Sequence, residues 1–327
     1  MATALKKDPS RTAVLRRRFV ADMNRRFKKL SREIEKLIVT DDAFGLNENA
    51  PFTFSKGIEK RKFVLATNIE RQAWRFQTDA QKVGSYRRWL QGEIDAGILT
   101  VDGLGNPWTN TYVQSAYRKG FARSYGEVKK LEGGFFTGTK DQFLQEAFNA
   151  PVIQSKLELI YTRTFSGLQD ITTSMSQQMS RILVDGLSAG QGPTVIARQL
   201  RNNLAKINRT RALVIARTEV IHAHAEGQLD SFERLDVDEV DVFAEWSTAG
   251  DDLVCPLCAP LEGAIMTIKE ARGTLPRHPN CRCAWKPAEK QKGRRKKTQA
   301  KIDDSIQAER PNKPLKEARR RSTWLGK

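Results

Sequence analysis

The sequence has no long hydrophobic run and very little cysteine or histidine. No stretch of the 327 residues approaches the ~18 consecutive apolar residues of a membrane-spanning helix, so no membrane span and no membrane partner are predicted. The first residues, Met1 to Lys7, lack the apolar segment of a secretory signal, so we expect synthesis in a reducing cytoplasm. In that reducing setting the four cysteines are expected to bind metal rather than form disulfides.

Signs of catalysis are also missing. The glycine-rich segments match no phosphate-binding loop, and no nucleophile stands in an evident pair with a base, so the sequence predicts a protein that is not an enzyme. The apolar residues, at 39%, are sufficient to build a buried core.

Positive charge is concentrated at the two ends of the chain. Residues 1–37 hold 12 Lys/Arg against 4 Asp/Glu, and residues 286–327 hold 15 against 5, whereas the stretch between them carries no net charge. Basic arms attract a polyanion, and nucleic acid is the default partner, although solvated tails share this composition. The expected DNA-contact residues are Arg16, Arg17, Arg18, Arg294, Arg295, Lys296 and Lys297.

Helical periodicity dominates the first 235 residues. Apolar residues recur every three or four positions from Leu15 to Leu37, which predicts an amphipathic helix in a basic arm over 1–57. A helical body is expected over 58–189, followed by a compact module over 190–287 and a disordered basic tail over 288–327. The helices expected in these segments are 58–82, 85–98, one capped by Thr109 or Asn110, 151–166, 168–188, 194–204 and 210–235, with a strand over 240–247.

All four cysteines and one of the three histidines fall within one short window. The candidate ligands are Cys255, Cys258, His278, Cys281 and Cys283. A Cys-x-x-Cys pair, a loop and a second pair is the spacing of a closed structural zinc site. The second pair is either His278 with Cys281 or Cys281 with Cys283, and the spacing does not choose between them. The predicted fold class is mainly α, with a helical body, a small α+β zinc-knuckle module and basic terminal arms.

The helix before this window carries unusual polar residues. Glu219, His222 and Glu226 share one face of an otherwise apolar segment, and Arg217 lies beside them. Acid–base chemistry or a second metal is one interpretation. We favour a structural hydrogen-bonded network, with Arg217 and Glu219 as members, that ties this helix to the zinc module.

Several short motifs follow one another over about residues 190–287. They are Ala216-Arg217-Thr218-Glu219, Ala225-Glu226-Gly227, Glu245-Trp246-Ser247-Thr248, Asp251-Asp252, Cys255-x-x-Cys258, Leu261-Glu262-Gly263 and Pro276-Arg277-His278-Pro279-Asn280-Cys281-Arg282-Cys283. In order and spacing they resemble the F-like minor head proteins of tailed bacteriophages, the head-morphogenesis family named after phage Mu. Glu226 stands where the family often has Asn, and a single proline, Pro276, stands where two often precede the histidine.

This resemblance implies a minor structural protein of the phage head. Such proteins associate with the portal vertex inside the virion head and support head assembly, genome packaging or ejection. The implied partners are the portal protein, a major capsid or scaffold protein, and double-stranded DNA. The cofactor expected from the cysteine spacing is a structural Zn²⁺.

Two other classes of function remain open at the level of sequence. The first is a zinc-stapled nuclease or processing enzyme, in which His278 would be a base rather than a ligand. The second is a zinc-ribbon DNA-binding protein, which would need a helix that presents base-reading side chains to the major groove.

Overall fold

The computed structural model describes residues 8–46, 78–130, 139–235, 242–289 and 294–309. The chain forms two compact units, each assembled from separate stretches of sequence. Unit 1 comprises Met1–Arg16, Tyr112–Leu157 and Thr218–Lys327, and unit 2 comprises Arg17–Thr111 and Glu158–Arg217. The domains expected from the sequence follow chain order, whereas these units do not.

Unit 2 is built from the helices that carry the strongest apolar periodicity. It contains most of α1 (Ala13–Glu35), η1 (Lys36–Thr40), α3 (Asp79–Gly97), the larger part of α6 (Pro151–Ser188), α7 (Pro193–Ile207) and η2 (Asn208–Ala212). The apolar face expected on α1 is buried from Phe19 to Leu37. Pro193 stands in the first turn of α7, where its missing N–H has no helical partner to lose. The helix expected over 58–82 lies outside the described residues as far as residue 77. The break expected between residues 82 and 85 is wrong, because Thr78 and Gln81 form a capping box and α3 therefore begins at Asp79.

Helix α6 is longer than the sequence indicated. The two helices expected on either side of Gly167 form one continuous helix of 38 residues. A glycine inside a helix destabilises it by only about 1 kcal/mol relative to alanine, which packing can offset. A Cβ at Gly167 would lie 3.0 Å from the Ile215 side chain, so the missing side chain admits a close neighbour here.

Unit 1 contains a very close approach of two helices. Helix α4 (Asn110–Val128) meets α8 (Leu213–Leu235) at two glycines, Gly120 and Gly227. A Cβ at Gly120 would lie 2.1 Å from the carbonyl oxygen of His224, and one at Gly227 would lie 2.3 Å from that of Tyr117. Only glycine allows the two backbones to approach this closely. The short helix α5 (Lys140–Asn149) adds Phe143 to the aromatic packing around Phe121.

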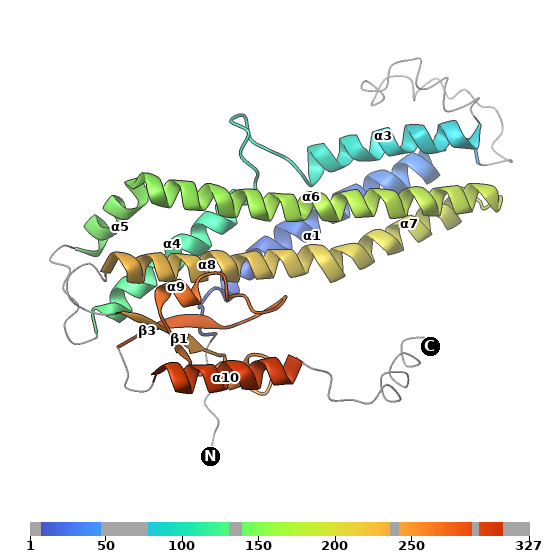
Figure 1. Ribbon diagram of the computed structural model, residues 1–327. Helices are drawn as coiled ribbons and strands as arrows, with labels where there is room; N and C mark the ends of the chain where they lie inside the picture. Colours follow the sequence, from blue (N-terminus) through green and yellow to red (C-terminus); the bar gives the residue numbers. More distant parts are fainter. Residues whose placement is uncertain (1–7, 47–77, 131–138, 236–241, 290–293, 310–327) are drawn as a thin grey trace. The chain divides into compact units, whose positions relative to one another are not determined.

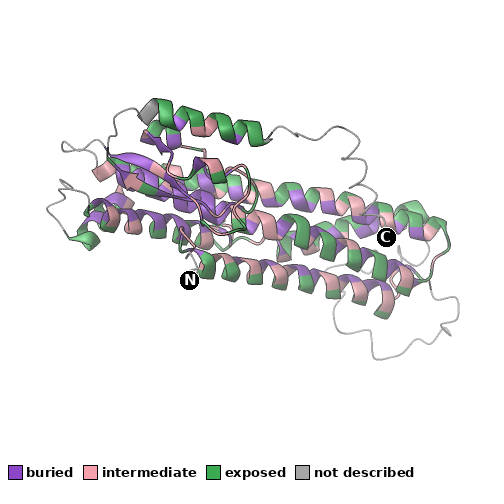
Figure 2. Cartoon of the chain, turned by 90° about the horizontal axis from the view of Figure 1, so that it is seen from below, coloured by how far each residue is buried: buried purple, intermediate pink, exposed green. Residues whose placement is uncertain are grey.

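A three-stranded antiparallel sheet completes unit 1. The strands are β1 (Phe243–Ser247), β2 (Ile265–Met266) and β3 (Ala284–Ala288), in the order β2-β1-β3. Trp246 and Trp285 are directly paired across β1 and β3, and their rings pack edge to face with centroids 5.3 Å apart. The strands are largely buried (Figure 2), and they share an apolar core with Leu229 and Phe232 of α8.

Part of the tail expected to be disordered is helical. Residues 294–309 form α10, which lies on the other side of the sheet from α8 (Figure 1). Thr298 donates to the carbonyl of Ile265 at 2.7 Å, and Ser305 donates to that of Leu257 at 2.7 Å. Ile302 packs against the apolar core, so three residues spaced along one face are enough to dock a helix that is otherwise polar. Residues 310–327, including Trp324, lie outside the described residues.

The fold class expected from the sequence is confirmed, because a mainly helical body is joined to a small sheet-containing module. None of the described helices combines the length and apolar character needed to cross a bilayer.

Candidate metal centre

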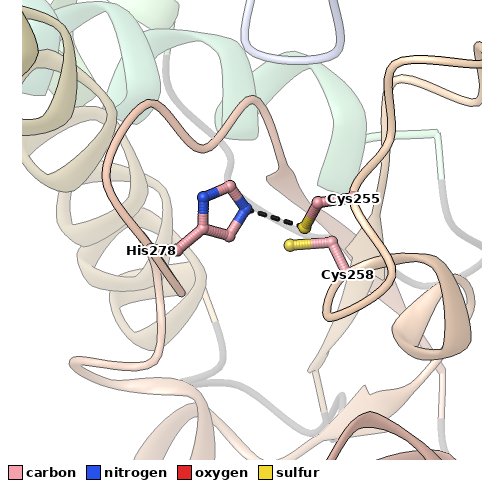
Figure 3. Close-up of side chains that lie close together, drawn as sticks. All are labelled: Cys255, Cys258 and His278. Carbon is pink, nitrogen blue, oxygen red and sulfur yellow. Dashed lines mark hydrogen bonds between the residues drawn. The ribbon is translucent and has the colours of Figure 1, made fainter. Parts of the chain in front are cut away.

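The structure brings all five candidate ligands into one cluster. They form two overlapping triads, Cys255 with Cys258 and His278, and Cys258 with Cys281 and Cys283, and the ligand atoms within each triad lie within 4.8 Å of one another. His278 Nε2 lies 3.0 Å from Cys255 Sγ (Figure 3). Cys258 Sγ lies 4.0 Å from Cys281 Sγ. Two sulfurs bound to one tetrahedral zinc at ~2.3 Å are ~3.8 Å apart, so the thiols already have near-metal spacing.

Two tight turns position four of these ligands in the same way. The N–H of Cys258 donates to the carbonyl of Cys255 at 3.1 Å, and the N–H of Cys281 donates to that of His278 at 3.1 Å. A proline, Pro256 or Pro279, occupies the second position of each turn, where its fixed φ is suited. Asn280 has φ 62°, the left-handed conformation that a type II turn needs at its third position and that asparagine tolerates.

The ring of His278 is oriented by its own turn. Its Nδ1 lies 2.8 Å from the carbonyl oxygen of Pro279, which fixes the proton on Nδ1 and leaves the Nε2 lone pair facing Cys255. Figure 3 shows the ring aimed at the two sulfurs of the first turn. Metal-binding histidines usually make such a hydrogen bond through the ring nitrogen that does not bind the metal.

The thiols of the second triad do not ionise independently. Hydrogen bonding to Cys281 raises the pKa of Cys258, whereas hydrogen bonds from Cys258 and Cys283 lower the pKa of Cys281. Several thiolates this close repel one another unless a cation sits among them, and a coordinated metal deprotonates such thiols. The donor set therefore fits a thiolate-rich metal site, and the cluster can hold a metal ion.

Apolar packing and one ion pair enclose the cluster. Cys258, Cys281 and Cys283 are buried in the same core as the paired tryptophans. Outside it, Arg282 contacts both carboxylate oxygens of Asp251 at 2.6 and 2.7 Å, and these hydrogen bonds lower the pKa of Asp251. This contact ties the loop after β1 to the second turn.

A buried carboxylate in α8 anchors the loop between the two ligand turns. Asp230, with a side chain 1% exposed, accepts hydrogen bonds from Tyr117 at 2.5 Å, Lys156 at 2.5 Å and Arg272 at 2.6 Å. Glu226 accepts from Arg272 at 3.2 Å and from the N–H of Gly273 at 3.1 Å. Burial, and then the charge of Asp230, raises the pKa of Tyr117, so its hydroxyl stays a donor.

The tie between α8 and the ligand loop thus includes Glu226, which the sequence singled out, and Asp230, which it did not. Thr218 also takes part, because its hydroxyl accepts from the N–H of Asn280 at 3.2 Å. Glu219 is buried in α8, but Arg217 is exposed, so the two do not share an interior environment. A structural role for Arg217 and Glu219 stays a prediction.

The sequence did not indicate that Asp230 accepts hydrogen bonds from three side chains, or that His224 is buried. His224 is 1% exposed, and burial, followed by the charge of Arg123, lowers its pKa to about 3. It is therefore neutral at physiological pH. The only signal in the sequence is a polar residue within an apolar helix, which does not separate a buried group from an exposed one.

The expected DNA-contact residues lie at the starts of two helices. Arg17 and Arg18 are exposed on α1, whereas Arg16 is half-buried and paired with Asp8 at 2.5 Å. Lys296 and Lys297 are exposed on α10. Arg294 and Arg295 begin α10, and their side chains lie outside the described part of the structure.

The fold and the cluster together define a mainly helical protein that carries a small Cys/His knuckle module. Residues 177–286 match the family model described as Phage Mu protein F like protein, which confirms the resemblance over that segment. The matched segment contains α7, α8, β1, β2, the first part of β3 and all five candidate ligands. The match supports a phage head morphogenesis protein. No curated protein and no solved structure matches the chain significantly.

Proposed function

We propose that this protein is a minor structural component of a tailed-phage head that binds the portal vertex inside the virion and supports head assembly and genome packaging or ejection. The observation that carries this proposal is the position of the family match. It covers all five candidate ligands and helix α8, whose Asp230 anchors the loop between the two ligand turns. The portal protein and a capsid or scaffold protein are the expected protein partners.

The knuckle module is proposed to hold one structural Zn²⁺ through Cys255, Cys258, His278 and Cys281. These four residues begin and end the two equivalent turns, and His278 is already oriented by Pro279. Cys283 then stays beside the site as a buried thiol that does not bind the metal. A thiolate-rich tetrahedral site has no open position for substrate, so the metal contributes to folding rather than to catalysis.

A nuclease or processing activity is the less favoured function. A general base must reach a substrate proton, but His278 Nε2 lies 3.0 Å from Cys255 Sγ within the cluster. The opposite ring nitrogen is engaged with the Pro279 carbonyl. The geometry therefore supports a ligand rather than a base.

The basic segments at both ends are proposed to contact packaged DNA without sequence preference. Arg17, Arg18, Lys296 and Lys297 are exposed and offer charge, but they do not present a fixed base-reading geometry. If ~8 cations contact phosphates, log K should fall against log salt with a slope near −7.

The portal assignment is tested by co-expression with the portal protein from the same genome, purification through a tag on the portal, and mass spectrometry. We expect this protein to stay bound through a high-salt wash. The matched control is a tagged portal from an unrelated phage, which should retain none. Recovery on host nucleic acid instead of the portal contradicts the proposal.

The ligand set is tested by measuring metal stoichiometry in three variants. Cys258→Ser removes the thiol shared by both triads and should abolish binding, and His278→Ala should weaken it strongly. Cys283→Ser should retain one metal per chain. Cobalt substitution counts the thiolates through the sulfur-to-metal charge-transfer band, and a site with four thiolates rather than three contradicts the His278 assignment.

A further inference from the structure

A basic groove runs along α1 in unit 2, at residues C-terminal to Arg16, Arg17 and Arg18, which the sequence assigns to DNA contact. The hollow measures about 640 Å³ and is lined by α1 together with Arg201 of α7. Its cations are Arg25, Lys28, Arg32 and Arg201, and its single carboxylate is Glu35, which gives it a formal charge of +3.

The cations of α1 lie in one row. Arg25, Lys28 and Arg32 are spaced by three and four residues, which places them on one helix face. From Arg25 to Arg32 the row extends over two turns, or ~10 Å at 1.5 Å per residue. The acidic residue Glu33 lies on another side of α1, because its charge, after burial, helps to raise the pKa of Glu93 in α3.

Two of these cations are available to a ligand. Arg201 is held by Glu35 at 2.5 Å, which neutralises the one carboxylate of the groove, and Arg25 pairs with Asp22. Lys28 and Arg32 are exposed and form no ion pair with any described residue. The groove also contains Ser31 and Asn24, and the oxygen of the Asn24 amide is occupied because it accepts from Asn208 at 2.7 Å. Hydroxyl and amide groups beside Lys and Arg are typical partners of phosphate oxygens.

We propose that this groove is a second, independent binding surface for the phosphate backbone of double-stranded DNA, with Lys28 and Arg32 as its main contacts. The proposal rests on the proposed DNA contact of this protein and adds a surface on the helical body. Because the helix is rigid, its row of cations keeps a fixed spacing along the phosphates of one DNA strand. The groove therefore contributes affinity without selecting sequence.

The test uses the full chain with its bound metal and a short fluorescent duplex of arbitrary sequence. The double variant Lys28→Gln with Arg32→Gln should weaken binding about tenfold or more at moderate salt, and the salt slope should shrink by about 1.8, because each phosphate contact contributes about 0.9. The control, Lys129→Gln with Lys130→Gln, makes the same change of charge at exposed positions of unit 1. It should leave the affinity and the slope close to those of the unmodified protein.

Each other outcome overturns a defined part of the proposal. If the unmodified protein does not bind DNA, the proposed DNA contact fails together with the groove. If it binds but the groove variant binds equally well, or both double variants lose affinity equally, the groove assignment alone fails. If the groove variant keeps DNA affinity but no longer co-purifies with the portal, the surface binds an acidic protein instead. The melting temperature of both variants, expected to be unchanged, excludes misfolding as the cause.

Discussion

The two compact units of this protein are stabilised in different ways. Unit 2 is held by apolar side chains distributed along α1, α3, α6 and α7, and its polar contacts, such as Arg201 with Glu35, are half-exposed. Unit 1 depends on a few specific points: a Cys/His cluster, one buried carboxylate, and two glycines at a helix crossing. A distributed core tolerates the loss of any one contact, whereas a fold with few fixed points does not. Single substitutions at these points should therefore destabilise unit 1 more than comparable substitutions destabilise unit 2.

Metal removal should give the largest difference between the units. Chelation removes the ion that would hold the two ligand turns together. In isolated zinc-finger peptides the free energy of zinc binding is about 10–16 kcal/mol at neutral pH, which is an upper bound for the stabilisation of this module. Hydrogen exchange monitored by mass spectrometry should show loss of protection in β1, β3 and the short helix α9 (Ile268–Ala271), with α3 and α7 little changed. Unchanged protection after complete metal removal would falsify a structural role for the metal.

Removal of the buried carboxylate should have the next largest effect. Asp230→Ala leaves Tyr117, Lys156 and Arg272 without their shared acceptor, and breaking a buried ion pair typically destabilises by about 3–5 kcal/mol. Lys156 and Arg272 are partly exposed and still contact other carboxylates, so the loss is expected at the lower end of this range. We expect the free energy of unfolding, measured by urea titration, to fall by about 3 kcal/mol. Glu233→Ala is the control, because its side chain is 58% exposed although it contacts Arg272 at 2.5 Å, and it should cost less than about 1 kcal/mol. Equal losses of stability from the two substitutions would show that the burial of Asp230 does not explain its contribution.

The helix crossing should be sensitive to a single methyl group. Gly227→Ala places a Cβ 2.3 Å from the Tyr117 carbonyl oxygen, so α4 and α8 must move apart at a cost of about 2–3 kcal/mol. Gly126→Ala, also in a helix of unit 1 but with nothing within 4 Å, should stabilise by about 0.5–1 kcal/mol. Thermal unfolding of the two variants measures both shifts, and a neutral Gly227→Ala would mean that the helices do not pack this closely.

The smallest effect is expected at the exposed ion pair of unit 2. Glu35→Gln removes the partner of Arg201 in a pair whose two side chains are 44% and 46% exposed. Such pairs contribute about 0.2–1 kcal/mol and are screened by salt, so the change should vanish in urea titrations at high ionic strength. A loss above about 2 kcal/mol would indicate that unit 2 also depends on specific points.

Local patterns predicted the local elements well. The helix expected over 194–204 is found at Pro193–Ile207, the one over 85–98 is found at Asp79–Gly97, and the metal cluster follows directly from the spacing of its cysteines. The continuity of α6 through Gly167 and the docking of α10 were not predictable, because each depends on a neighbour distant in sequence. The same holds for Asp230, whose partners Tyr117 and Arg272 are 113 and 42 positions away. Periodicity reports which face of a helix is buried but not which residues meet there.

The distance in sequence between Tyr117 and Asp230 also affects the order of folding during synthesis. A ribosome that adds about 5–20 residues per second needs roughly 6–20 s to make the chain between them. During that interval α4 has been made without α8, and its glycine face is open to other partners. Contacts of such high order form slowly even in a complete chain. Unit 1 should be completed last, because its segment Thr218–Lys327 is made after the last residue of unit 2, Arg217.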